Sequence, residues 1–194
     1  MKKSTLLLAF AITIASFAQA QVRLGFKGGA NLANLTGDIE STKMKVGFNA
    51  GLLAKISVSE AFSIQPELVF SSQGSTLEEG DTDIKMELSY INLPIMFQYN
   101  IAGFNFETGP QAGFLMSAKL KAMGESMDIK EGMKSIDFSW GVGLGYKMAG
   151  SGLGFNARYN IGLSAVNDSD GDAKFKNSVI QIGAFYMLGR PSRD

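Results

Sequence analysis

The chain has 194 residues, with 18 basic and 18 acidic side chains, no histidine and no cysteine. Without cysteine the protein has no disulfides, no thiol chemistry and no lipid-modified cysteine anchor. Without histidine, Ser-His-Asp and Cys-His catalysis are impossible, and the usual general base and metal ligand are missing. The balanced charge does not favour nucleic acid as a partner, and the length fits a single domain.

Residues 1–20 have the pattern of a secretory signal peptide. Two lysines follow the initial methionine, a short apolar stretch covers 6–17, and Ala-Gln-Ala at 18–20 is a small-residue cleavage site. A membrane anchor is the alternative, but the apolar stretch is too short to span about 30 Å of hydrocarbon. We therefore predict a signal peptide over 1–20 and one domain over 21–194.

Behind this leader, apolar and polar residues alternate in segment after segment. In the segment 153–163, Leu153, Phe155 and Ala157 share one face, and Arg158 lies on the other. Side chains alternate between the two faces of a strand, so each segment has one oily and one polar face. We count eight such segments, at 22–32, 46–58, 62–73, 88–100, 104–118, 135–148, 153–163 and 176–188. Oily faces toward lipid and polar faces toward the interior are typical of an outer-membrane barrel.

The connections between these segments alternate in length. Three are tight turns and four are longer polar loops: the turns lie at 59–61, 101–103 and 149–151, the loops at 34–45, 74–87, 120–134 and 166–175. Outer-membrane barrels have short periplasmic turns and longer extracellular loops. The predicted fold is therefore all-β: an eight-stranded antiparallel up-and-down transmembrane β-barrel in the outer membrane, with both termini in the periplasm.

Aromatic side chains gather at the strand ends near the short turns. They are Phe62, Tyr99, Phe104, Tyr146, Phe155 and Tyr186. Amphipathic rings favour the bilayer interface, and aromatic girdles mark the edges of such barrels. The alternative is a set of ordinary core aromatics in a soluble sheet, and the placement near the turns favours the girdle.

Strand phase places several charged side chains inside the barrel: Lys27, Lys55, Glu67, Glu107, Asp137, Lys147 and Arg158. They could line a path for a ligand or an ion, or they could form a structural network. Eight strands leave an interior that side chains just fill, and buried charges need partners of opposite sign. We therefore predict an ion-pair network of Lys27, Lys55, Glu67, Glu107, Asp137 and Arg158. Glu67 and Glu107 could also form a catalytic carboxylate pair, but a small barrel lacks the cleft a glycosidase needs, so no enzyme activity is expected.

Two loop features leave alternatives open. The stretch DSDGD at 168–172 is similar to a calcium loop but lacks the glutamate that completes an EF-hand, and Asp, Ser and Gly also simply make turns; we expect no metal and no cofactor. Five methionines in predicted loops could form an adaptable binding surface or cap the barrel mouth. They are Met44, Met86, Met123, Met127 and Met133.

Several motifs together resemble the PorT-like family of small outer-membrane β-barrels. They are GFKGGANL at 25–32, GFNAG at 47–51, IQPEL at 64–68 with SSQG at 71–74, YINLP at 90–94, ETGPQAGF at 107–114 and ARY at 157–159. The resemblance covers essentially the whole mature chain and implies an eight-stranded barrel. It implies no single function, although some members are tied to protein secretion. The tail at 189–194 departs from many barrel proteins, which end on their last strand.

Three functions are compatible with the sequence. The first, which we predict, is a non-enzymatic outer-membrane barrel with a filled lumen and a structural or surface-interaction role. The second is a narrow pore or carrier for small molecules. The third is a soluble periplasmic barrel that binds an apolar ligand as lipocalins do, which requires the oily faces to point inward. The predicted partners of a monomer are outer-membrane lipid and proteins that bind the extracellular loops.

Overall fold

The computed structural model describes residues 22–37, 42–79, 82–122, 124–168 and 174–189, so the predicted signal peptide lies outside the described residues. The described part contains nine strands and one short 3₁₀ helix. The strands are β1 (Val22–Gly37), β2 (Thr42–Ser57), β3 (Phe62–Glu79), β4 (Thr82–Ile101), β5 (Phe104–Ala122), β6 (Glu125–Asp128), β7 (Ile136–Lys147), β8 (Leu153–Gly162) and β9 (Phe175–Met187), and the helix is η2 (Lys130–Gly132).

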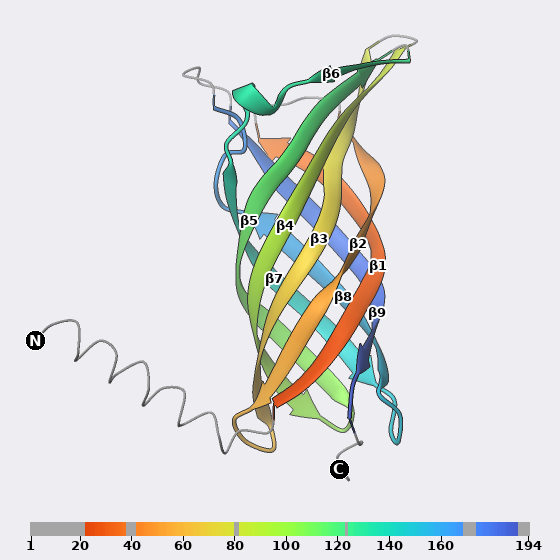
Figure 1. Cartoon of the computed structure of the whole chain (residues 1–194), viewed down its shortest axis with the longest axis vertical. Helices are drawn as coiled ribbons and strands as arrows, with labels where there is room; N and C mark the ends of the chain where they lie inside the picture. The colour runs from red at the N-terminus through yellow and green to blue at the C-terminus, as the bar shows by residue number, and fades with distance from the viewer. Residues whose placement is uncertain (1–21, 38–41, 80–81, 123, 169–173, 190–194) are drawn as a thin grey trace, which may run out of the picture.

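Eight of these strands close into a barrel (Figure 1). Consecutive barrel strands pair antiparallel, β4 pairs with β5, and β9 returns to pair with β1. The remaining strand, β6, pairs only with the end of β5. The predicted eight-stranded antiparallel barrel is thus confirmed, with β6 as an addition that the sequence did not reveal. Closure leaves no unpaired strand edge in the wall, as a barrel in lipid requires.

The two ends of the barrel differ. At one end the strands join through the short connections 58–61, 102–103 and 148–152, and β1 begins and β9 ends there (Figure 1). Ala102 (φ +49°) and Gly103 (φ +80°) form a two-residue turn between β4 and β5. Positive φ at both positions is the geometry that matches the twist of a tight hairpin. We call this the short-turn end, and the opposite one the long-strand end.

At the long-strand end, the strands run well beyond the segments that the sequence predicts. Most of the predicted loop 74–87 belongs to the β3–β4 hairpin, where Ser75 pairs with Met86, and much of the predicted loop 34–45 lies in β1 and β2. The physical reason is visible along β4, whose side chains keep alternating between the outer and inner faces while the polarity of the two faces is exchanged. Near mid-strand the outer face carries the apolar residues Ile91 and Leu93. Closer to the long-strand end, the outer face carries the exposed Lys85 and the inner face carries the buried Leu88. An outer face that is apolar against lipid becomes polar against water.

The outer wall of the barrel is apolar in its middle and lower part. More than thirty large hydrophobic side chains are exposed, whereas most buried polar and charged side chains of the described residues point into the lumen. The lipocalin-like reading needed the opposite arrangement and is therefore wrong. The described residues contain no helix of the length and apolarity that a membrane span requires.

Polar atoms on this outer wall bond to one another. Trp140 Nε1 donates to Thr108 Oγ1 at 2.8 Å, and Thr108 Oγ1 donates to the carbonyl of Gly141 at 3.1 Å. The hydroxyls of Tyr159 and Ser178 lie 3.0 Å apart. Such local pairing is what polar groups need where no water is available.

Candidate functional site in the barrel lumen

The lumen has three levels. An apolar cap closes the long-strand end, a layer of ion pairs crosses the middle, and a polar cavity opens at the short-turn end. Each level is built by inward side chains whose height in the barrel is set by strand register.

The middle level is an ion-pair layer of four charged side chains. Arg158 donates from Nη2 to Glu67 Oε1 at 2.7 Å, from Nη1 to Glu67 Oε2 at 3.0 Å and from Nε to Glu107 Oε1 at 2.7 Å. Lys27 Nζ donates to Glu67 Oε2 at 3.1 Å. All four side chains are almost fully buried. Two cations and two carboxylates make the layer neutral.

Neighbouring amides complete the ion-pair layer. Gln65 Nε2 donates to Glu67 Oε1 at 2.8 Å, and Gln98 Nε2 donates to Glu107 Oε2 at 3.0 Å. All four carboxylate oxygens therefore accept at least one hydrogen bond, which offsets much of the cost of burying charge. Gly143, the cross-strand partner of Arg158, provides the room, because an added Cβ there would lie 3.0 Å from Glu107 Oε1.

The other charged residues predicted to point inward lie at different levels. Asp137 is nearer the long-strand end, where it accepts from Ser164 Oγ and Asn177 Nδ2, each at 2.9 Å. Lys55 is nearer the short-turn end, where its Nζ donates to Asn100 Oδ1 at 2.6 Å. Lys147 lines the cavity at that end. Strand phase indicates which residues point inward, but not which of them share a height.

The apolar cap consists of Leu35, Leu88, Tyr90, Leu115, Ala118, Met133 and Val166. Backbone bonds hold its upper segments together, since Lys134 N donates to Val166 O and Val166 N donates to Phe175 O, each at 2.8 Å. Of the loop methionines, Met86 and Met133 pack in or against this cap, which is one of the two alternatives the sequence left open. Met44 and Met127 are exposed on β2 and β6, and Met123 lies outside the described residues.

The cavity at the short-turn end has a volume of about 610 Å³. Its lining includes Arg23, Lys55, Asn100, Lys147 and Phe185. Phe185 places an aromatic ring on the inward face of its strand, where Val179 and Met187 are also apolar. The ring lies over Gly154, where an added Cβ would overlap it. Sequence reasoning did not single out Arg23 or Asn100 as site residues, although both are polar residues at inward positions.

The six aromatic residues of the predicted girdle all lie on the outer wall near the short-turn end. Two cross-strand pairs among them are in ring contact: Phe62 with Tyr99, at 5.1 Å between centroids, and Phe104 with Tyr146, at 4.8 Å. Phe26 stacks on Tyr186 at 5.5 Å, and Phe155 pairs with Ala184 in the register.

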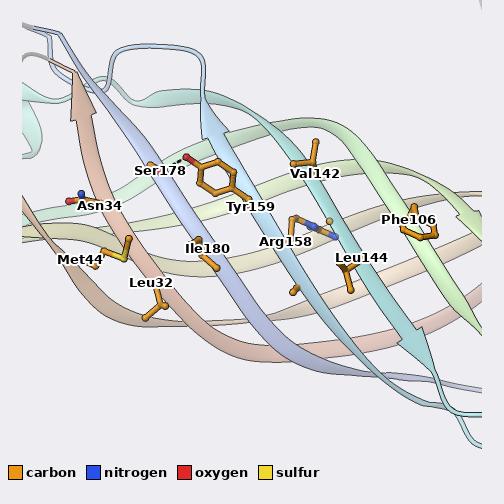
Figure 2. A pocket seen from close by; sticks show the side chains of 12 residues that line it. Leu32, Asn34, Met44, Phe106, Val142, Leu144, Arg158, Tyr159, Ser178 and Ile180 are labelled. Carbon is orange, nitrogen blue, oxygen red and sulfur yellow. Dashed lines mark hydrogen bonds between the residues drawn. The ribbon is translucent and has the colours of Figure 1, made fainter.

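A separate groove of about 580 Å³ lies on the outer wall (Figure 2). It is lined mainly by outward apolar side chains, among them Leu32, Val142, Leu144, Tyr159 and Ile180. Its position on the apolar wall suits the acyl chains of surrounding lipid rather than a dissolved substrate.

No cluster of three or more potential metal ligands occurs within the part of the chain that the structure describes. The acidic stretch 168–172 lies outside that part except for Asp168, which is exposed.

Comparison with known proteins identifies the kind of barrel. Residues 17–168 match the family model of the outer membrane protein beta-barrel domain, and none of the curated protein sequences matches the chain. The fold is similar to that of Neisserial surface protein A, with 12% identity, a TM-score of 0.55 and coverage of 85% of this chain and 97% of that one. It is also similar to Ail, the attachment invasion locus protein of Yersinia pestis, with 17% identity, a TM-score of 0.51 and coverage of 86% and 98%. A second Ail structure, in complex with the heparin analogue sucrose octasulfate, has 17% sequence identity and a TM-score of 0.52. The match covers 86% of this chain and 99% of that one.

Proposed function

Because the chain belongs to the outer membrane protein beta-barrel domain family, we propose that it is a non-conducting, non-enzymatic surface protein that acts through its long-strand end. The observation that carries this proposal is the closed lumen. The ion-pair layer crosses the middle and the apolar cap lies above it. A solute would have to break buried ion pairs and then cross an apolar layer, each of which costs several kcal/mol.

Planar bilayer recording tests the closed lumen. The barrel is purified from outer membranes of cells expressing the full chain and is compared before and after boiling, to establish that it is folded. The folded wild type should show negligible steady conductance. A matched variant, Glu67→Ala with Arg158→Ala, empties the centre of the ion-pair layer while keeping the net charge, and it should leak more than the wild type. A large stable conductance of the wild type would favour the pore or carrier function instead.

The long-strand end offers a surface for anionic partners. Lys85 and Lys121 are cross-strand neighbours, and Lys119 pairs with Glu87 in the same register. All three lysines are exposed. Glu87 is bound by Lys121 at 2.9 Å, and Asp128 is the cross-strand partner of Lys119. The three lysines outnumber these two carboxylates, and a positive patch of this kind attracts polyanions. Since the structurally similar Ail is described in complex with a heparin analogue, a sulfated glycan is the first partner to test.

The test measures heparin binding to the purified barrel at several salt concentrations. Replacing Lys85, Lys119 and Lys121 by glutamine should weaken binding and flatten its dependence on salt. Three other exposed lysines, Lys130, Lys134 and Lys174, provide a control with the same change in charge. Equal losses in both triple variants would mean that heparin responds only to net charge, and this surface role would be rejected.

Two finer assignments belong to the same proposal. We propose that residues 1–20 are removed on export, leaving Gln21 as the first residue of a monomeric barrel domain, which N-terminal sequencing of the membrane-inserted protein tests. The kinship with PorT-like barrels is supported by the motifs at 25–32, 64–68 and 107–114. We also propose that the barrel is oriented as other outer-membrane barrels are, with its short turns on the inner side of the membrane, so that the short-turn end faces the periplasm.

A further inference from the structure

The cavity at the short-turn end, here called the Arg23 vestibule, is a blind pocket. Its walls include Arg23, Lys55, Asn100, Lys147 and Phe185, and its volume is about 610 Å³. The side chains of Gln65 and Gln98 border it below the ion-pair layer, to whose carboxylates they donate hydrogen bonds. A small solute could therefore enter from the short-turn end but could not pass through.

Cationic side chains outnumber carboxylates among the described residues that line the vestibule. Three cationic side chains line it, from Arg23, Lys55 and Lys147, and one carboxylate, from Glu60. The carboxylates of the ion-pair layer are already neutralised by Lys27 and Arg158. Arg23 and Lys55 are also direct cross-strand partners, so their positive charges lie side by side in the wall.

The guanidinium of Arg23 has two unused hydrogen-bond donors. Its Nε and Nη2 atoms are buried from solvent and have no hydrogen-bond partner among the described residues. These two nitrogens form one edge of the guanidinium plane, and that edge matches the two oxygens of a carboxylate or phosphate. A charged donor left buried without an acceptor is costly, so turning this edge into the vestibule to meet an oxyanion would relieve that cost.

The adjoining wall, formed by β2, β3 and β4, is held in place by a chain of hydrogen bonds. Lys55 Nζ donates to Asn100 Oδ1 at 2.6 Å, Asn100 Nδ2 donates to Ser63 Oγ at 3.0 Å, and Ser63 Oγ donates to Gln98 Oε1 at 3.2 Å. Through Gln98 the chain reaches Glu107 in the ion-pair layer. The ammonium of Lys55 is therefore fixed at the wall before any ligand arrives, which lowers the entropic cost of binding.

We propose that the Arg23 vestibule binds a phosphate-type oxyanion, with the Nε–Nη2 edge of Arg23, turned into the vestibule, as its bidentate donor and Lys55 as its second cation. The phosphate belongs either to a free small molecule or to the headgroup of a phospholipid at that end of the barrel. This site lies at the end opposite to the lysines of the proposed surface role, so either proposal can fail without the other.

The experiment titrates the full-length-expressed, membrane-purified barrel in a maltoside detergent that contains no phosphate. One arm uses inorganic phosphate and the other uses dihexanoyl phosphatidylglycerol below its micelle concentration. Binding is followed by calorimetry and by backbone amide chemical shifts. The variants are Arg23→Gln, Arg23→Lys and Lys55→Gln, with Lys130→Gln at the long-strand end as the charge-matched control. Heat-modifiable mobility on a detergent gel verifies that each variant is folded.

The proposal expects saturable binding of at least one phosphate ligand, with shift changes at vestibule amides such as Gly103 and Asn105. Arg23→Gln should weaken binding roughly tenfold or more, as loss of a charge-assisted bidentate contact implies. Arg23→Lys should restore only part of it, because an ammonium lacks the planar fork, and Lys130→Gln should bind as the wild type does. Binding of the lipid alone assigns the headgroup as the source. The proposal is overturned if neither ligand binds the wild type, or if folded Arg23→Gln and Lys130→Gln bind equally well.

Discussion

Arg158 and Glu67 bind each other across the full diameter of the barrel. Their strands, β8 and β3, are opposite in the closed order, with three strands between them on either side. The guanidinium meets the carboxylate through two hydrogen bonds of 2.7 and 3.0 Å. A fork-to-fork contact fixes both distance and orientation. This pair therefore ties the two walls together and obstructs the lumen at the same height.

Replacing Arg158 by methionine should destabilise the barrel. The change leaves Glu67 and Glu107 with only Lys27 as a counter-charge, and breaking a buried pair from one side costs about 3–5 kcal/mol. Urea-induced unfolding in detergent measures the loss. The double variant Glu67→Gln with Arg158→Met also removes the charge of one carboxylate that lost its partner. Its loss of unfolding free energy should therefore be smaller than the sum of the losses in the two single variants. Strict additivity of the two changes would contradict a direct interaction.

The outward orientation of Ala157 predicts a strong penalty for charge at that position. Ala157 lies on the apolar outer wall, beside the inward Arg158. Arginine on the lipid face near the bilayer midplane costs about 2–4 kcal/mol, so Ala157→Arg should lower the stability of the barrel folded into lipid vesicles by that order. Ala157→Leu, which adds only apolar surface toward lipid, should stay within about 0.5 kcal/mol of the wild type. Equal effects of the two substitutions would mean that this wall does not face lipid.

Trp140 provides a spectroscopic probe of the same wall, because it is the only tryptophan of the chain. Its side chain is 41% exposed on the apolar surface. Lipids brominated along their acyl chains should quench its fluorescence strongly, whereas the aqueous quencher acrylamide should have little effect. The matched probe is Phe185→Trp in a Trp140→Phe background, which places the indole beside the vestibule. This variant should be quenched by acrylamide more strongly than by brominated lipid.

The hydrogen bond from Trp140 to Thr108 should matter for stability because water is absent on the lipid face. Thr108→Val keeps the shape of the side chain but removes the acceptor, leaving the indole N–H unpaired at a cost of about 1–3 kcal/mol. Thr108→Ser keeps the hydroxyl and should retain most of the stability. Reversible unfolding in lipid vesicles compares the two. A valine variant as stable as the serine variant would show that the indole N–H finds another partner.

The sequence was sufficient for the architecture because alternation and loop length report directly on strands and their connectivity. It failed at the long-strand end for a physical reason. On β4 the outer face changes from Ile91 and Leu93 to Glu87 and Lys85 without any change of phase. A search for strands with an oily outer face therefore stops where the wall leaves the apolar band, although the ladder continues to Thr82.

The candidate site was only partly predictable. Alternation indicates that Glu67, Asp137 and Arg158 point inward, but it carries no information about height. Register decides that Arg158 meets Glu67, whereas Asp137 lies with Asn177 nearer the cap. The vestibule was missed because Arg23 is unremarkable as one more polar residue at an inward position, until the cross-strand pairing sets it beside Lys55.

Gly154 leaves space for the ring of Phe185, which points from β9 into the lumen. The two residues are cross-strand partners, and an added Cβ at Gly154 would overlap the ring. Gly154→Ala should therefore cost about 1–3 kcal/mol through overpacking, measured by urea unfolding. Adding Phe185→Leu should recover much of this loss, because the smaller side chain vacates the contested space. Gly28→Ala is the matched control, since a Cβ there meets its nearest neighbour at an ordinary 3.6 Å. If Gly154→Ala is no more costly than Gly28→Ala, the ring is not packed on that glycine.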